Sequence, residues 1–116
     1  MVYIPQDKFA KRARREGFRA RSAYKLLDLQ KKFQLIKAGD KVLDLGAAPG
    51  GWIQVASPIV GQNGLVVAVD IEVINPFGLR FGQIFQKNIE DEDFIEFLAK
   101  RGYKIFDVVL SDVAPN

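Results

Sequence analysis

The chain has 116 residues, 48% of them hydrophobic and 27% charged, so we expect one soluble domain over residues 1–116 and exclude a two-domain enzyme. Cys and His are absent, which excludes disulfides, zinc sites built on thiolates or imidazoles, and a histidine general base, and we expect no metal site. No window approaches the roughly 18 apolar residues of a membrane helix, and the N-terminus lacks the apolar core of a secretory signal. These features predict a cytoplasmic protein with no membrane partner.

The formal net charge of +3 is divided unevenly along the chain. Residues 1–41 carry twelve Lys or Arg and four Asp or Glu, whereas the remaining residues carry five and ten. A charge run is usually a solvated face, but a basic segment joined to an acidic body favours docking to an RNA phosphate backbone. We expect residues 1–37 to form a basic helical arm whose RNA contacts read little sequence. The predicted RNA-binding residues are Lys8, Lys11, Arg12, Arg14, Arg15, Arg19 and Arg21.

After this basic segment, the hydrophobic pattern predicts alternating helices and strands. Ser22 is a candidate N-cap for a helix that ends before residue 38. Near-continuous Val, Ile and Leu segments are typical of strands buried on both faces of a parallel sheet. The predicted fold class is therefore α/β, with a Rossmann-like sheet of four parallel strands over residues 38–116. The expected strands are 41–46, 65–70, 82–87 and 106–112, and the expected helices between them are 51–60 and 92–101.

The last predicted strand, 106–112, lies four residues before the end of the sequence, with no helix or strand after it to cover it. An uncovered apolar edge is usually paired or shielded in natural proteins. We therefore expect self-association through this strand, for example as a homodimer.

A glycine-rich loop, DLGAAPGGW at residues 44–52, follows the first strand and opens a helix. This is where α/β folds bind nucleotide-like ligands. The loop is an imperfect dinucleotide fingerprint, because Ala48 occupies the second glycine position. Asp70, at the end of the second strand, is placed to accept hydrogen bonds from ribose hydroxyls, which suits NAD and S-adenosylmethionine equally. The competing interpretation is that the glycines form a tight turn and that Asp70 caps the next segment.

Three features favour S-adenosylmethionine over NAD. Asp44 precedes the glycines, where it can accept a hydrogen bond from the cationic amino-acid part of that cofactor. Pro49 removes a backbone N–H that a pyrophosphate site would use. Asp112 adds a second carboxylate at the same edge of the sheet.

Three motifs in this order, RARSAYKL at 19–26, DLGAAPGGW at 44–52 and VVLSDVAPN at 108–116, resemble the FtsJ (RrmJ-like) family of S-adenosylmethionine-dependent RNA ribose 2′-O-methyltransferases. The resemblance runs from about residue 7 to residue 116. It implies that Asp70 binds the ribose, and that Asn88 stands where the family commonly has an aspartate reading the adenine amino group. An Asn carbonyl can accept the same hydrogen bond. The full set of expected cofactor-binding residues is Asp44, Gly46, Ala48, Pro49, Gly50, Gly51, Trp52, Asp70, Ile71, Asn88 and Asp112.

The resemblance also implies two catalytic residues. Lys25 and Asp112 match the first two members of the family's Lys-Asp-Lys-Glu set. In methyl transfer to a ribose hydroxyl, Lys25 would favour the oxyanion character of the attacking oxygen and Asp112 would help position the hydroxyl. Without the resemblance, Lys25 would be one more solvated helix lysine. The second lysine and the glutamate have no counterpart in this sequence, so we expect weak or absent turnover by a chain that is either truncated or processed, or a deliberately halved Rossmann domain that keeps the cofactor half.

Three functions follow from the sequence. The first is an RNA 2′-O-methyltransferase, with ribosomal RNA as the expected substrate, of which this chain carries the cofactor-binding half. The second is a non-catalytic module that binds S-adenosylmethionine or RNA. The third is an NAD-dependent oxidoreductase, disfavoured by Ala48 and Pro49 and by the lack of an evident hydride-transfer partner.

Overall fold

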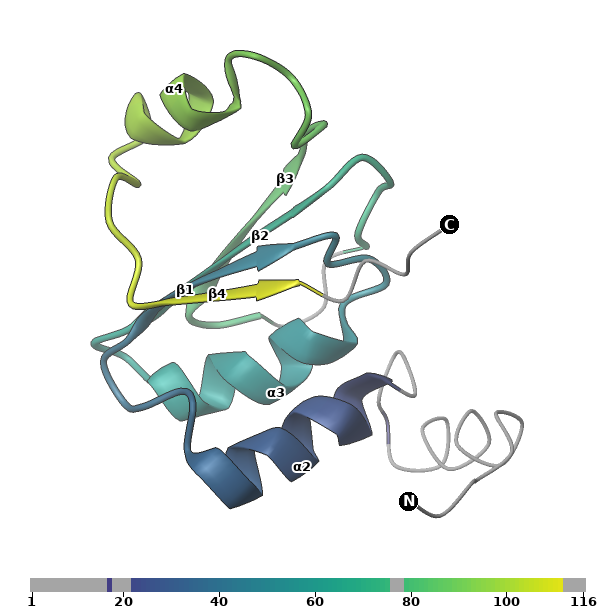
Figure 1. Ribbon diagram of the computed structural model, residues 1–116, viewed down its shortest axis with the longest axis vertical. Helices are drawn as coiled ribbons and strands as arrows, with labels where there is room; N and C mark the ends of the chain where they lie inside the picture. The colour runs from purple at the N-terminus through teal and green to yellow at the C-terminus, as the bar shows by residue number, and fades with distance from the viewer. Residues whose placement is uncertain (1–16, 18–21, 76–78, 112–116) are drawn as a thin grey trace.

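The computed structural model describes residue 17 and residues 22–75 and 79–111, and within them four parallel strands form one sheet between two layers of helix (Figure 1). None of the helices within these ranges has the length and apolar character needed to cross a bilayer. The elements in chain order are α2 (Ser22–Phe33), β1 (Lys41–Leu45), α3 (Gly51–Val60), β2 (Leu65–Asp70), β3 (Gly82–Gln86), α4 (Phe94–Ala99) and β4 (Val108–Ser111).

The strand order is β3-β2-β1-β4, and every neighbouring pair is parallel. The second and third strands step outward on one side of β1, and the fourth returns to its other side. The order changes direction between β1 and β4, and in such folds ligands bind outside the carboxyl ends of the strands beside this switch point. The predicted α/β, Rossmann-like fold with four parallel strands is confirmed.

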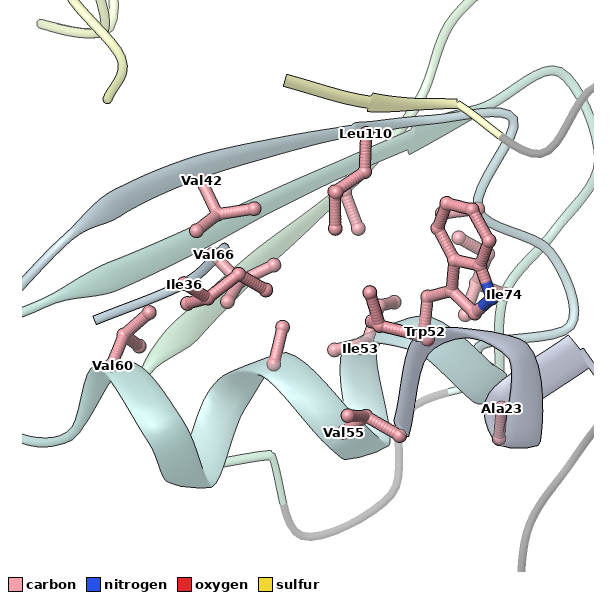
Figure 2. Packing of buried hydrophobic residues seen from close by; sticks show 14 residues of the cluster. Ala23, Ile36, Val42, Trp52, Ile53, Val55, Val60, Val66, Ile74 and Leu110 are labelled. Carbon is pink, nitrogen blue, oxygen red and sulfur yellow. The ribbon is translucent and has the colours of Figure 1, made fainter. Parts of the chain in front are cut away.

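The two central strands bury alternate side chains in two separate cores. On one face, Val42 of β1 and Val66 of β2 pack with α2 and α3, and Figure 2 shows Ile53 and Val60 of α3 beneath them. On the other face, Val67 packs in the cluster that contains residues of α4. This alternation is the two-residue period of a strand covered on both faces.

The edge strands differ from the expectation of burial on both faces. The side chains of β3 are half-buried or exposed. In β4, Leu110 is buried but Val109 is 59% exposed. Of the strand predicted over 106–112, residues 108–111 form β4 and residue 112 lies outside the described ranges. Asp107 precedes the strand, where its carboxylate accepts a hydrogen bond from the Lys41 backbone N–H (2.8 Å). The homodimer through this edge stays a prediction.

Two helices, α2 and α4, are shorter than predicted, and at the end of α2 a side chain bonds the backbone beyond the helix. The helix expected to reach residue 37 ends at Phe33, where Gln34 adopts a positive φ of 48°. The Gln30 side chain both donates to the Ile36 carbonyl (2.6 Å) and accepts from the Ile36 N–H (2.9 Å). The helix expected over 92–101 spans only Phe94–Ala99, and no side-chain hydrogen bond caps its start. Ser22, the expected N-cap, is the first residue of α2 itself.

Candidate functional site

A cavity of about 660 Å³ opens at the carboxyl ends of three neighbouring strands. This volume lies within the range of small-molecule sites. Its lining comes from the loops after β1, β2 and β3, so the sheet order alone brings together segments that are more than forty residues apart in the sequence. The lining residues are Gly46, Asp70, Ile71, Glu72, Lys87, Asn88, Ile89 and Glu90.

The glycine loop forms one wall of this cavity and is shaped by backbone hydrogen bonds. The N–H groups of Gly46 and Ala47 both donate to the Val69 carbonyl (2.9 and 3.2 Å), which ties the loop to the end of β2. Gly46 has a φ of 72° and Gly50, immediately before α3, has a φ of 115°. Residues with a side chain rarely adopt these φ values. The two glycines therefore set the path of the loop. Between them, the peptide bond that joins Ala48 and Pro49 is cis.

Asp70 links the glycine loop to the segment after β2. Its Oδ2 accepts a hydrogen bond from the Ala48 N–H (2.8 Å), and its Oδ1 accepts one from the Glu72 N–H (2.8 Å). The capping role weighed from the sequence is thus present. Each carboxylate oxygen has a further lone pair, so Asp70 keeps acceptor capacity for hydroxyls in the cavity. Its predicted contact with ribose stays a prediction.

A second, smaller hollow of about 40 Å³ adjoins the glycine loop and shares Gly46 with the large cavity. Asp44 lies on its wall and is 2% exposed. The structure therefore divides the predicted cofactor residues. Gly46, Asp70, Ile71 and Asn88 line the large cavity, Gly46 also lines the small hollow together with Asp44, Ala48, Pro49, Gly51 and Trp52, and Gly50 lines neither.

Trp52 has a structural role that the sequence did not indicate. Its side chain is 7% exposed and packs in the core with Ile53 and Ala23 (Figure 2). Its indole N–H donates to the Ser22 carbonyl (2.7 Å), thirty residues away in the chain. This bond holds the start of α2 against the start of α3.

The candidate catalytic residues are only partly described. Lys25 is exposed on α2, one turn beyond the bond between Trp52 and Ser22. Asp112 and the predicted RNA-binding residues Lys8, Lys11, Arg12, Arg14, Arg15, Arg19 and Arg21 lie outside the described ranges. The last described residue of β4, Ser111, pairs with Leu45, so β4 reaches the level at which the glycine loop begins.

Asn88 begins the opposite wall of the cavity, in the loop between β3 and α4. Its side-chain oxygen Oδ1 accepts a hydrogen bond from the Glu90 N–H (2.9 Å), which closes a tight Asx-type turn. One of the two lone pairs of this oxygen is therefore used within the loop, and the other remains as an acceptor, while the expected contact with adenine stays a prediction. Ile71 and Ile89 supply apolar surface beside it.

Lys87 forms a cluster of ion pairs at the same wall, which sequence reasoning missed. Its Nζ lies 2.8 Å from Asp93 and 3.2 Å from Asp91, and its side chain is only 17% exposed. The hydrogen bond to Asp93 raises the pKa of Lys87 above its usual value and lowers the pKa of Asp93 below its own. Spacings of four and six residues between a lysine and two aspartates were the available signal, but a loop gives them no fixed geometry.

Comparison with known proteins connects this geometry to a family. The family model described as "FtsJ-like methyltransferase" matches residues 18–116. The chain belongs to this family. The resemblance inferred from the three motifs is thereby confirmed, and the match to the FtsJ-like methyltransferase model includes both walls of the cavity.

The names of proteins similar to this chain agree with its assignment to the FtsJ-like family. Proteins named ribosomal RNA large subunit methyltransferase E are 44% identical in Myxococcus xanthus and 46% identical in Acinetobacter baylyi, over 98% and 95% of this chain. A crystal structure described as a ribosomal RNA methyltransferase from Plasmodium falciparum is 26% identical, with a TM-score of 0.66 over 85% of this chain and 58% of its own. The chain spans about half the length of the curated relatives, 54% and 50% of the two named here.

Proposed function

We propose that this chain binds S-adenosylmethionine and forms the cofactor-binding half of a methyltransferase that acts on the ribose 2′-OH of RNA. The observation that carries the proposal is the cavity of about 660 Å³, which brings Asp70 and Asn88 together across the ends of β2 and β3. In this proposal residues 38–116 hold the cofactor and residues 1–37 dock RNA.

The cavity fits this cofactor in polarity and in charge. Ile71 and Ile89 offer apolar surface to an adenine ring, and the second lone pairs of Asp70 suit ribose hydroxyls. The lining carries three carboxylates, Asp70, Glu72 and Glu90, and one ammonium, Lys87. Such a lining attracts a cation and repels a pyrophosphate. This charge balance favours S-adenosylmethionine over NAD.

S-adenosylmethionine supplies an electrophilic methyl group on a sulfonium. In our proposal Asp44, buried beside the small hollow, faces the cationic amino-acid part. Asp70 orients the ribose and thereby the reacting end. Lys25 and Asp112 act on the attacking hydroxyl, Lys25 by stabilising negative charge on its oxygen and Asp112 by positioning it.

RNA, and ribosomal RNA in particular, is the proposed substrate because the relatives are named for it. The basic residues before α2 supply the phosphate contacts. Gly17, the one described residue of that segment, accepts a hydrogen bond from the Gln54 side chain of α3 (3.0 Å). This contact joins the basic segment to the same helix that the glycine loop opens.

Calorimetry with S-adenosylmethionine, S-adenosylhomocysteine and NAD tests the cofactor. We expect the first two to bind and NAD not to bind, and the reverse order would overturn the proposal. Transfer of a labelled methyl group to RNA, with DNA of the same sequence as the control lacking the 2′-OH, then tests the reaction. Transfer above the DNA control would support the methyltransferase reaction, whereas cofactor binding without transfer fits both the cofactor-binding half, for which weak or absent turnover is expected, and the binding module that the sequence left open.

A further inference from the structure

We infer that Lys87 is a positioning residue for the nucleoside end of the cofactor. It acts by holding the loop of residues 88–93 in the conformation that completes the cavity, and its own ammonium is directed at acids of that loop. The inference rests on the proposed function, since it assigns a role within the proposed S-adenosylmethionine site.

Lys87 joins the two segments that would hold the nucleoside. Its backbone N–H donates to the carbonyl of Asp70 (2.9 Å), the proposed ribose-binding residue. Its side chain reaches forward to Asp91 and Asp93, at the far end of the loop that begins with Asn88. One residue therefore fixes the distance between the end of β2 and the adenine wall.

The loop itself is held by short-range bonds. Asn88 accepts from Glu90 through its side chain (2.9 Å) and from the Asp91 N–H through its carbonyl (3.2 Å), and the Phe94 N–H donates to the Asp91 carbonyl (3.0 Å). These bonds define consecutive turns but not the angle between the loop and β3. The ion pairs of Lys87 join the end of β3 to the start of α4 and so fix that angle.

The charge of the loop explains why a cation is needed there. Residues 90–93 are Glu, Asp, Glu and Asp, four acids in succession. Their mutual repulsion favours a spread loop. The Lys87 ammonium pairs with two of these acids, Asp91 and Asp93, and so offsets part of this repulsion.

Aromatic packing keeps the ammonium in place. Lys87 Nζ lies 5.2 Å from the centre of the Phe97 ring, within the range of a cation–π contact. Phe97 meets the Phe85 ring edge to face, with ring centres 5.5 Å apart, and the Arg101 guanidinium lies 3.6 Å from the Phe97 centre. The Phe97 ring that contacts the Lys87 ammonium is thus itself held in a packed cluster.

The test compares Lys87→Met with Lys100→Met. Lys100 pairs with Glu96 (3.1 Å) on the exposed surface of α4, and neither residue lines the cavity. We expect Lys87→Met to weaken S-adenosylmethionine binding roughly tenfold, the equivalent of one charge-assisted hydrogen bond. Binding of 5′-methylthioadenosine, which lacks the amino-acid part, should weaken by the same factor, because the change lies at the nucleoside end. Lys87→Arg should restore most of the affinity, and Lys100→Met should bind as the unaltered chain does.

Calorimetric affinities and thermal unfolding of each variant decide between the outcomes. Equal affinity of Lys87→Met and the unaltered chain would overturn the inference, as would an equal loss in Lys100→Met. If Lys87→Met fails to fold, Asp93→Asn replaces it, and an unchanged affinity there would also overturn the inference. Failure of the unaltered chain to bind S-adenosylmethionine would instead overturn the proposed function, and the inference with it.

Discussion

The two walls of the cavity are built in different ways. On the β1 side, the wall is Gly46, and the glycine loop that continues from it is held by its backbone N–H groups, which donate to the Val69 carbonyl and the Asp70 carboxylate. On the β3 side, the wall is held by side chains, chiefly the ion pairs of Lys87 with Asp91 and Asp93. Both walls meet at Asp70, whose carboxylate bonds the first and whose carbonyl bonds the second.

This contrast predicts which changes each wall tolerates. A wall held by backbone bonds depends on residues that permit its dihedral angles. A wall of exposed or half-exposed ion pairs is screened by salt and altered by the loss of one charge. The same cavity therefore combines two kinds of wall. The glycine loop, residues 44–52, forms a rigid wall that requires glycine, and the loop of residues 88–93 forms an adjustable wall, whose conformation depends on the charge of Lys87.

The largest effect is expected where the walls meet. Asp70→Asn replaces one of two acceptor oxygens by an NH₂ group, which opposes the N–H of either Ala48 or Glu72. We expect S-adenosylmethionine binding to weaken by about 100-fold, because one charge-assisted hydrogen bond is lost and one donor is left facing another. Glu72→Gln removes the same charge from the cavity but keeps the backbone N–H, and calorimetry should show a loss at least several-fold smaller. Similar losses in both variants would mean that charge, and not loop geometry, dominates.

Gly50→Ala tests the glycine loop that continues from the β1-side wall, at a residue that lines neither hollow. A side chain at a φ of 115° is strained by about 1–2 kcal/mol, so we expect lower thermal stability and weaker cofactor binding. Gly102→Ala is the matched control, because Gly102 also has a positive φ (88°), an added Cβ meets nothing within 4 Å there, and the residue lies away from the cavity. Its stability should fall comparably while its affinity stays unchanged. Unaltered binding in Gly50→Ala would show that the loop tolerates a different path.

The contrast between the walls also explains what the sequence could predict. The strand over 65–70 and the helix over 51–60 were predicted with their observed bounds, because continuous burial and a glycine boundary are local signals. The glycine loop was recognised from its residues for the same reason. The wall on the β3 side was recognised only at Asn88, since the spacing of Lys87 from Asp91 and Asp93 acquires meaning only from the path of the loop.

Element ends were less predictable where a distant or flexible side chain decides them. The bonds of Gln30 to the backbone of Ile36 stop α2 at Phe33, although the residues beyond remain compatible with a helix. Trp52 was expected at the cofactor through the family resemblance, which carries no information on its bond to Ser22, thirty residues away. Pairings of this kind arise from tertiary packing and have no periodic signature.

A smaller effect on cofactor affinity is expected for Trp52→Phe, which tests how the glycine loop and α3 are joined to α2. The change keeps an aromatic ring in the core but removes the donor to the Ser22 carbonyl, at a cost of about 1–3 kcal/mol if that carbonyl stays buried without a partner. We expect hydrogen exchange to accelerate at the start of α2 and the cofactor affinity to change little. Loss of cofactor binding with unchanged exchange in α2 would assign Trp52 to the cofactor directly.

The smallest effect concerns the response of the adjustable wall to pH. The pKa of Asp93 is lowered by its hydrogen bond from Lys87, so this pair stabilises the fold above the usual aspartate pKa and loses that contribution as the pH falls through the lowered value. Between about pH 5 and pH 3, the unfolding free energy measured with urea should fall more steeply for the unaltered chain than for Asp93→Asn. Glu96→Gln, which removes a carboxylate of α4 from its ion pair with Lys100, measures what any exposed acid contributes. If the slopes of all three proteins coincide, the ion pairs of Lys87 do not stabilise the wall, and the distinction between the two walls fails on this side.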